Sequence, residues 1–208
     1  MERKIVFLDI DGVLQPGHSQ NRFDHIHHEE EKSDMPKLYR SLENEFQIDY
    51  SKYNQYDVAA VFFDWDKESV NLLKLTLSLT GAKIVLSSDW RRGGFERMKD
   101  FFTIYGLEKY YLDDTKFRKD IAQDFIDQAK AKHKEEKGEK AYLDERSIEI
   151  LEWLSRNPDV KKWVAIDDMS LSGLDRHFVL TGYGHRFGWE DAEKSIRILS
   201  RKKRVSKI

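Results

Sequence analysis

The chain has 208 residues, of which 39% are hydrophobic and 36% are charged, and its formal net charge is −2. This length suits one well-packed domain and is short for two, and the charge argues against a protein dominated by binding of a phosphate backbone. The lack of cysteine excludes a disulfide framework, a thiolate nucleophile and a cysteine-based metal site. The chain shows no apolar leader and no run near the roughly 18 apolar residues of a membrane span, so we expect a cytoplasmic globular protein with no membrane segment.

The first predicted element is a buried strand over residues 5–8, within the stretch KIVFLDIDGVL. Two acids, Asp9 and Asp11, follow this strand before Gly12, the residue that supplies the turn. Carboxylates so close together repel each other. The arrangement therefore indicates a strand end that presents negative charge to a cation.

Residues 15–62 interrupt the alternation of strands and helices. The segment is polar, carries Pro16, Gly17 and Pro36, and holds one predicted helix over residues 37–46. A structureless loop of this length is unusual in a compact domain unless it has a function. We therefore expect a small cap, or lid, inserted over the edge of the sheet.

The remainder of the chain alternates between helix and strand signals. A helix is predicted over 67–80, with Asp66 as its N-cap and Gly81 as its stop. In chain order there follow a strand at 83–86, a helix around 95–102, a short strand at 110–112 and a charged helix over 117–136, within a second insertion at 113–143. Then come a helix between Asp144 and Pro158, strands at 163–166 and 177–181, and a final helix around 192–199.

Continuously apolar strands that alternate with helices predict a single α/β domain, in which helices sandwich a Rossmann-like parallel sheet. Ligands of such sheets bind beyond the carboxyl ends of the strands. Three separate predicted strands end in polar groups, at Asp9, Ser88 and Asp167. Since parallel strands end at one edge, we expect these side chains to meet there.

Clustered carboxylates at strand ends suit Mg²⁺, which is commonly held by one or two carboxylates together with substrate phosphate and water. Zinc is less suitable, because the chain has no cysteine and no histidine adjoins the three acidic strand ends. Beside a phosphate, an aspartate such as Asp9 can act as a nucleophile. Asp11 can then protonate the leaving alcohol and later deprotonate water, help that contributes about 10²–10⁴ in rate.

Three motifs carry a resemblance to the haloacid dehalogenase-like (HAD) superfamily. DIDGV resembles its first motif, DxDGT/V, IVLSS resembles the second and VAIDD the fourth, in that order along the chain. The likeness covers residues 1–14 and 64–199 and leaves out the insertions. The stretches LSSDWR and HFVLT are similar to a HAD group that also occurs fused to RNA-repair modules and whose proposed relatives include polynucleotide-end phosphatases.

The resemblance implies a role for each motif residue. Asp9 is the implied nucleophile and Asp11 the acid/base, and this second aspartate favours phosphoryl transfer over dehalogenation. Ser88 is the implied phosphate-binding residue, with Ser87 as the alternative in a register shifted by one. The implied Mg²⁺ ligands are Asp9, Asp11 through its backbone carbonyl, Asp167, and Asp168 directly or through water.

The third motif departs from the family pattern. The family usually places a lysine near the start of the helix before the fourth motif, where this chain has Arg146. Arginine also carries positive charge and binds phosphate bidentately, although it does not replace lysine neutrally. Lys140 is the alternative candidate for this role if its loop folds back. The competing interpretation is that Arg146 is an ordinary surface residue of the helix.

Two further residues follow the second motif. Arg91 is a candidate to bind a second phosphate or a nucleotide, with a solvated ion pair as the alternative. Trp90 is a candidate to stack on a base, with packing against the neighbouring helix as the alternative. The histidines at 25–28 and the basic tail at 201–208 fit a solvated loop and a disordered end better than a metal site or a nucleic-acid contact.

Together these features predict a Mg²⁺-dependent phosphomonoester hydrolase that acts through an aspartyl-phosphate at Asp9. The expected partner is a phosphorylated small molecule or a nucleic-acid end, and a nucleotide or polynucleotide end is the leading substrate. A phosphatase of small metabolites is the near alternative. The alternative outside the enzymes is a non-catalytic partner module built on the same scaffold. The sequence leaves the oligomeric state open.

Overall fold

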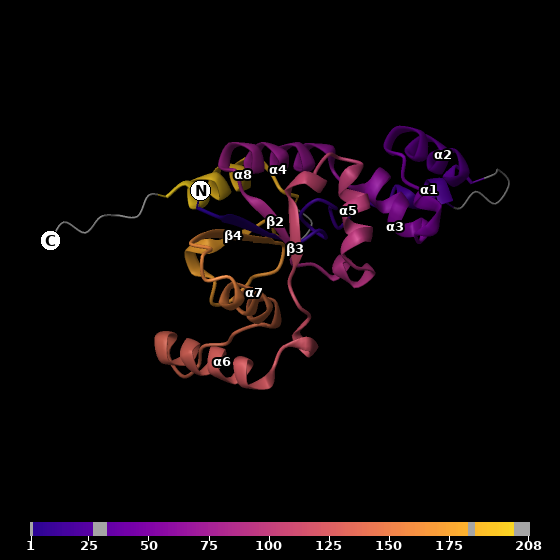
Figure 1. Cartoon of the computed structure of the whole chain (residues 1–208). Coiled ribbons are helices and arrows are strands. Elements are labelled where there is room, and N and C mark those ends of the chain that lie inside the picture. The colour runs from indigo at the N-terminus through magenta and orange to yellow at the C-terminus, as the bar shows by residue number, and fades with distance from the viewer. Residues whose placement is uncertain (1, 27–32, 183–185, 202–208) are drawn as a thin grey trace.

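The structure is a computed structural model that describes residues 2–26, 33–182 and 186–201. Its centre is a five-stranded parallel sheet in the order β3-β2-β1-β4-β5 (Figure 1). The strands are β1 (Lys4–Leu8), β2 (Lys83–Leu86), β3 (Tyr111–Asp114), β4 (Lys162–Asp167) and β5 (Phe178–Leu180). The predicted α/β class, a Rossmann-like parallel sheet between helices, is confirmed.

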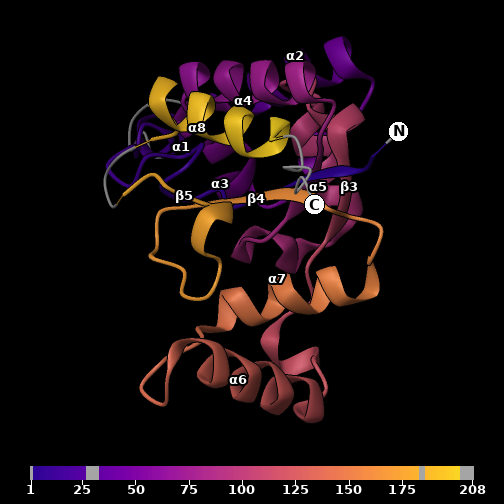
Figure 2. The same ribbon diagram turned by 90° about the vertical axis from the view of Figure 1, so that its left-hand side faces the viewer.

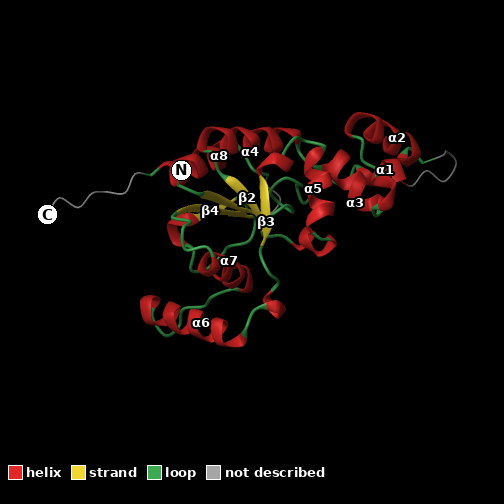
Figure 3. Ribbon diagram, viewed as in Figure 1, coloured by secondary structure: helices red, strands yellow, loops and turns green. Residues whose placement is uncertain are grey.

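Eight α-helices in the described part of the chain surround this sheet (Figure 3). They are α1 (Arg22–Ile26), α2 (Met35–Phe46), α3 (Gln55–Ala59), α4 (Lys67–Thr80), α5 (Phe95–Thr103), α6 (Gln123–Lys137), α7 (Glu145–Arg156) and α8 (Trp189–Ser200). None of the helices described is long and apolar enough to cross a membrane.

The helices form layers on both faces of the sheet, because successive strand side chains point to opposite faces. Val6 and Leu8 of β1 belong to a large apolar core shared with α4, α5 and α8. Ile5 and Phe7 point the other way and pack with Trp153 of α7. Outside α7 lies α6, joined to it by a small separate apolar cluster (Figure 2).

The two helices with the clearest sequence signals begin where those signals predict. At the start of α4 the Asp66 side chain accepts a hydrogen bond of 2.8 Å from the Ser69 amide, and at its end Gly81 takes the left-handed conformation with φ 70°. At the start of α7 the Asp144 side chain accepts from the Ser147 amide at 2.7 Å. That cap fixes the first turn of the helix that follows the second insertion.

The charged helix of the second insertion differs from the prediction. It was expected over 117–136, yet α6 begins at Gln123. Tertiary contacts hold the preceding residues out of the helix: the Phe117 ring packs under the guanidinium of Arg91, and the Arg118 amide donates to Glu149. The boundary at 113 also falls inside the sheet, because β3 runs to Asp114.

The predicted cap segment contains more helix than expected. In place of one helix over 37–46, it holds α1, α2 and α3, followed by a π-helical stretch over 60–64. The two extra α-helices have five residues each, too short to leave a clear periodic pattern in the sequence. The ends of the cap lie together, because the Asp66 amide donates to the Leu14 carbonyl at 2.7 Å.

The cap is fixed to the core through contacts with α5, and α3 lies between α5 and the other two cap helices (Figure 1). The Tyr50 hydroxyl donates to the Asp100 carbonyl at 2.8 Å, and the Tyr53 hydroxyl donates to the Asp100 carboxylate at 2.6 Å. Arg97 of α5 forms an ion pair with Asp57 of the cap. Buried cap residues also join the large apolar core, so the cap packs as part of the domain.

Candidate active site

The ends of β1, β2 and β4 meet at one edge of the sheet, as the parallel arrangement predicts. The Asp9 amide donates to the Ile166 carbonyl at 3.0 Å, and the Ser87 amide donates to the Leu8 carbonyl at 2.8 Å. These bonds extend the parallel ladder past the ends of the strands. The segments that carry the candidate aspartates and serines are thereby held side by side.

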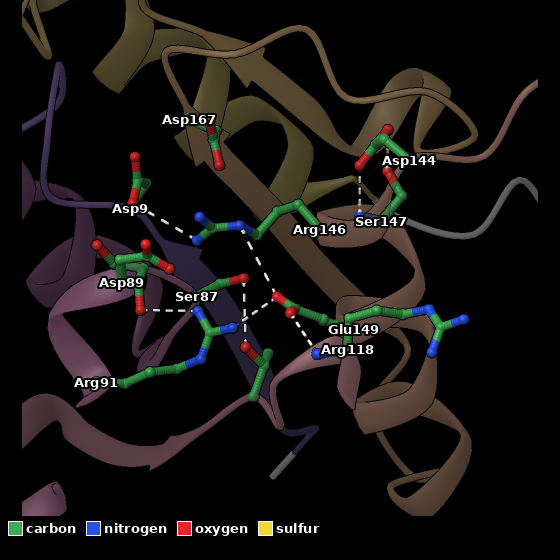
Figure 4. A network of polar contacts seen from close by, with 12 residues as sticks. Asp9, Ser87, Asp89, Arg91, Arg118, Asp144, Arg146, Ser147, Glu149 and Asp167 are labelled. Atoms are coloured by element: carbon green, nitrogen blue, oxygen red, sulfur yellow. Dashed lines mark hydrogen bonds and ion pairs between the residues drawn. The ribbon is translucent and has the colours of Figure 1, made fainter. Parts of the chain in front are cut away.

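Asp9 is buried, with 6% of the residue exposed, and it faces Arg146 of α7. Arg146 Nη1 lies 3.6 Å from Asp9 Oδ1 (Figure 4). This nitrogen is buried and has no hydrogen-bond partner among the described residues. A distance of 3.6 Å is too long for a hydrogen bond, so the nitrogen keeps its capacity to donate beside Asp9. The partial positive charge at the start of α7 acts in the same direction.

Three carboxylates gather at this edge. Asp9, Asp167 and Asp168 each offer an oxygen, and the three oxygens lie within 4.8 Å of one another. Burial raises the pKa of all three, repulsion from Asp167 raises that of Asp9 further, and Arg146 opposes the rise. An all-oxygen set with excess negative charge fits a hard divalent cation such as Mg²⁺.

The backbone at Gly12 makes room for this acid cluster. Gly12 has φ 69°, and a Cβ atom placed there would lie 2.3 Å from Asp168 Oδ2. A side chain is therefore excluded both by conformation and by space. Glycine at position 12 thus has a spatial reason, in addition to the turn that the sequence indicates.

Asp11 lies apart from the three clustered acids and is exposed. Its Oδ2 accepts a hydrogen bond of 3.1 Å from the indole nitrogen of Trp90. Partial burial raises the pKa of Asp11, and the bond from Trp90 opposes this rise. The Trp90 ring packs edge-on against Trp65 and Phe101. The indole therefore orients Asp11 from a packed position.

The two serines after β2 point to different neighbours. The Ser88 side chain is fully buried, and its hydroxyl lowers the pKa of Asp9 against the effect of burial. The Ser87 hydroxyl lies 3.5 Å from the Thr115 hydroxyl. Ser88 is thus the serine that adjoins Asp9. Of the two candidates for the third motif, Arg146 lies at Asp9, while Lys140 is exposed.

Glu149, which was not among the candidates from the sequence, is a buried carboxylate that connects the arginines of the site. Its Oε2 accepts from Arg91 Nη2 at 2.7 Å and lies 3.9 Å from Arg146 Nε, and its Oε1 accepts from the Arg118 amide at 2.8 Å (Figure 4). Burial raises the pKa of Glu149, and the two arginines oppose the rise. An acid inside the apolar run SIEIL, three residues after Arg146, is the signal that could have identified it.

Arg91 is connected to Arg146 through Glu149, and Arg146 is the arginine that faces Asp9. The Arg91 side chain is 3% exposed, and besides the bond to Glu149 it donates to the Ser88 carbonyl at 2.7 Å. Its Nε has no hydrogen-bond partner in the described part of the chain. Arg91 and Arg146 line a pocket of about 230 Å³, together with Glu149 and Met169. Binding of phosphate by Arg91 stays a prediction.

The histidine-rich stretch is only partly described. His25 stacks on Phe63 with ring centres 3.7 Å apart, and its Nδ1 lies 3.2 Å from Asp34 Oδ2. His27 and His28 lie outside the described residues, as does the tail at 202–208. His25 therefore packs within the cap.

Comparison with known protein families gives one match. The family described as HAD domain in Swiss Army Knife RNA repair proteins matches residues 5–192. This range includes all three motifs and both insertions. No curated protein and no solved structure matches the chain.

Proposed function

The chain belongs to the family of HAD domains in Swiss Army Knife RNA repair proteins, and on this basis we propose that it is a phosphatase that cleaves phosphomonoesters through an aspartyl-phosphate. Membership supports a HAD-type hydrolase. The observation that carries the finer proposal is the position of Asp9, buried among two other carboxylates, the Ser88 hydroxyl and the open donor of Arg146.

In the proposed first step a carboxylate oxygen of Asp9 attacks the phosphorus atom. The bond between phosphorus and the leaving oxygen breaks, and the proton of Asp11 passes to that oxygen, releasing an alcohol. Arg146 and Ser88 bind the phosphoryl oxygens, where preorganised donors stabilise developing negative charge. The phosphoryl group is then linked to Asp9 as an acyl phosphate.

In the second step Asp11 takes a proton from water, and the oxygen of that water attacks the same phosphorus atom. The bond to Asp9 breaks, inorganic phosphate leaves and Asp11 again carries a proton. The bond from Trp90 Nε1 keeps the Asp11 carboxylate in one orientation through both steps. Because Asp11 is exposed, water can reach it.

Asp9, Asp167 and Asp168 would hold a divalent cation, and the backbone carbonyl of Asp11 is the fourth candidate ligand. Burial raises the pKa values of the three acids, which supports a site that needs a cation when these acids are ionised. When bound, Mg²⁺ would neutralise this charge and admit an anionic substrate.

We propose a nucleotide or polynucleotide end as the substrate, supported by the family description. A small phosphorylated metabolite is the substrate class against which this is tested. The decisive comparison is turnover of terminally phosphorylated oligonucleotides and of a panel of sugar phosphates, both measured with Mg²⁺. Turnover confined to sugar phosphates would overturn the polynucleotide assignment and leave the phosphatase assignment intact.

The test of the chemistry uses p-nitrophenyl phosphate as a generic substrate. Asp9→Asn is expected to abolish turnover, because the amide is a poor nucleophile, while Asp11→Asn is expected to lose about 10²–10⁴ in rate. Activity should vanish with a chelator and return with Mg²⁺, and return less well with Ca²⁺, whose coordination is longer and looser. Asp127→Asn is the matched control, because Asp127 lies on α6 and is bonded to Gln123. Wild-type activity in Asp9→Asn would refute the covalent mechanism.

A further inference from the structure

We propose that the loop after β3, together with Arg92, forms a binding surface for the backbone of a single-stranded nucleic acid beside the candidate active site. We call it the cationic surface, and its residues are Arg92, Lys116, Phe117, Arg118 and Lys119. The inference deepens the proposed function and rests on it in one respect: the bound strand would carry the phosphate to be cleaved.

The cationic surface is built around one aromatic ring. The Arg91 guanidinium carbon lies 3.9 Å from the centre of the Phe117 ring, that of Arg92 lies at 5.1 Å and Lys119 Nζ lies at 6.0 Å. Arg91 is buried and holds the ring from within. Arg92 and Lys119 are exposed. The ring thus gathers cations that come from two separate loops.

Two cations of the surface, Lys116 and Arg92, have carboxylate partners, and two, Arg118 and Lys119, have none among the described residues. Lys116 pairs with Glu152 at 2.9 Å, and Arg92 pairs with Asp89 at 3.1 Å. Arg118 donates to the neutral amide of Gln123, and Lys119 has no ion pair with any described residue. Asp120 is the remaining acid in the loop. Residues 116–120 therefore carry three cations and one acid, a composition that complements a polyanion.

The loop that carries the cationic surface is linked to the candidate active site through buried side chains. The Arg118 amide is bonded to Glu149, which lies 3.9 Å from Arg146 Nε, and Arg146 lies 3.6 Å from Asp9. Both loops also leave the sheet at the carboxyl edge, after β2 and β3. Under the proposal, a strand whose terminal phosphate is at Asp9 extends from that edge toward this loop.

The chemistry of the surface matches a single strand better than a small anion. Proteins that bind single strands combine cations that follow the backbone with aromatic rings interspersed among them. The order Lys-Phe-Arg-Lys at 116–119 gives this combination on one loop. A small phosphate ester would occupy Arg146 and Ser88 and would not reach Lys119.

The experiment compares the wild type with the double variant Arg118→Ala, Lys119→Ala. Binding is measured by fluorescence anisotropy with single-stranded oligonucleotides of about ten nucleotides, phosphorylated at the 5′ end in one set and at the 3′ end in another. We expect affinity to fall about tenfold at low salt, and the slope of log K against log salt to fall by about 1.4, since each lost contact to a single strand removes about 0.7. Hydrolysis of p-nitrophenyl phosphate should stay at the wild-type level.

The matched control is the double variant Lys194→Ala, Arg197→Ala on α8. It also removes one lysine and one arginine, but on the opposite face of the sheet. It should leave both affinity and salt slope unchanged. Equal losses in the two double variants would overturn the proposal, as would wild-type binding in the loop variant or no oligonucleotide binding by the wild type. Anisotropy needs no turnover, so a protein that binds the strand but hydrolyses no phosphate would refute the proposed function alone.

Discussion

Glu149 and Arg146 lie three residues apart on α7, and together they connect Asp9 with Arg91. A buried carboxylate between the buried guanidinium of Arg91 and the largely buried one of Arg146 is stable only while each charge keeps its partner. Arg91 therefore balances Glu149, and Glu149 in turn restrains Arg146 on the side away from Asp9. Arg146 is left with one open donor where a phosphoryl oxygen would bind.

Substitution of Arg146 tests this assignment at the level of one side chain. Arg146→Ala is expected to lower kcat for p-nitrophenyl phosphate by about 10²–10³, the usual loss when a donor to a developing negative charge is removed. Arg146→Lys should recover part of the rate, because it keeps the charge and loses the planar fork. Steady-state kinetics on both variants provide the measurement.

Arg156→Ala serves as the control, because Arg156 lies at the far end of the same helix and pairs with Glu152. It should leave kcat unchanged. If Arg146→Ala behaved like Arg156→Ala, Arg146 would be an ordinary helix residue, which was the competing reading from the sequence.

At the scale of the element, α7 is the helix that determines where Arg146 points. Asp144 caps it and also ties it to the loop after β4, since Asp144 Oδ2 accepts from the Ser172 amide at 2.6 Å and from its hydroxyl at 2.8 Å. One carboxylate therefore joins the helix that carries the arginine to the loop that follows the paired acids.

Asp144→Ala is expected to reduce both stability and activity. Loss of an N-cap costs about 0.5–2 kcal/mol, which lowers the melting temperature by about 2–4 °C per kcal/mol in a domain of this size. Because the start of α7 would also shift, kcat should fall severalfold. The comparison is Asp66→Ala, which removes the corresponding cap of α4 and should lower stability while sparing kcat. Equal effects of the two changes on kcat would mean that α7 does not position the site.

The sequence predicted the elements whose signals are local. Asp66 and Gly81 gave the limits of α4, the apolar runs gave the strands, and the polar ends of three strands gave the edge at which the site lies. It could not predict the start of α6, because the Phe117 ring and the Arg118 amide are held by residues distant in the chain. Glu149 left one local signal, an acid inside the apolar run SIEIL, but its partners Arg91 and Arg118 come from other parts of the chain and only the fold brings them near.

At the scale of the whole molecule, burying Asp9 and Asp167 beside the half-buried Asp168 opposes folding unless a cation compensates these carboxylates. Their pKa values are raised, so between the ordinary aspartate pKa of about 4 and the raised values the folded state holds protons that the unfolded state has lost. The free energy of unfolding therefore falls as pH rises through this range. A bound divalent cation should reverse the effect.

Thermal unfolding of the wild type and of Asp9→Asn, each with a chelator or with Mg²⁺, tests this balance. With the chelator at about pH 8, Asp9→Asn should melt at least about 2 °C above the wild type, which corresponds to about 1 kcal/mol. The gap should narrow at about pH 5, where the wild-type carboxyl also binds a proton. Mg²⁺ should raise the melting temperature of the wild type more than that of the variant. A lower melting temperature for metal-free Asp9→Asn at both pH values would contradict the proposed electrostatic cost.

The hydrogen bond between the Asp66 amide and the Leu14 carbonyl has a consequence for how such a domain can diversify. Because the insertion leaves and returns at one point, its length contributes only a slowly growing loop-closure entropy, about 0.6 kcal/mol for each doubling. The insertion can thus be replaced, in evolution or by design, without a change in the order of the strands in the sheet. A replacement must still cover the face of α5 that Tyr50 and Tyr53 now occupy. The insertion can therefore change independently of the strand ends that carry the acid cluster.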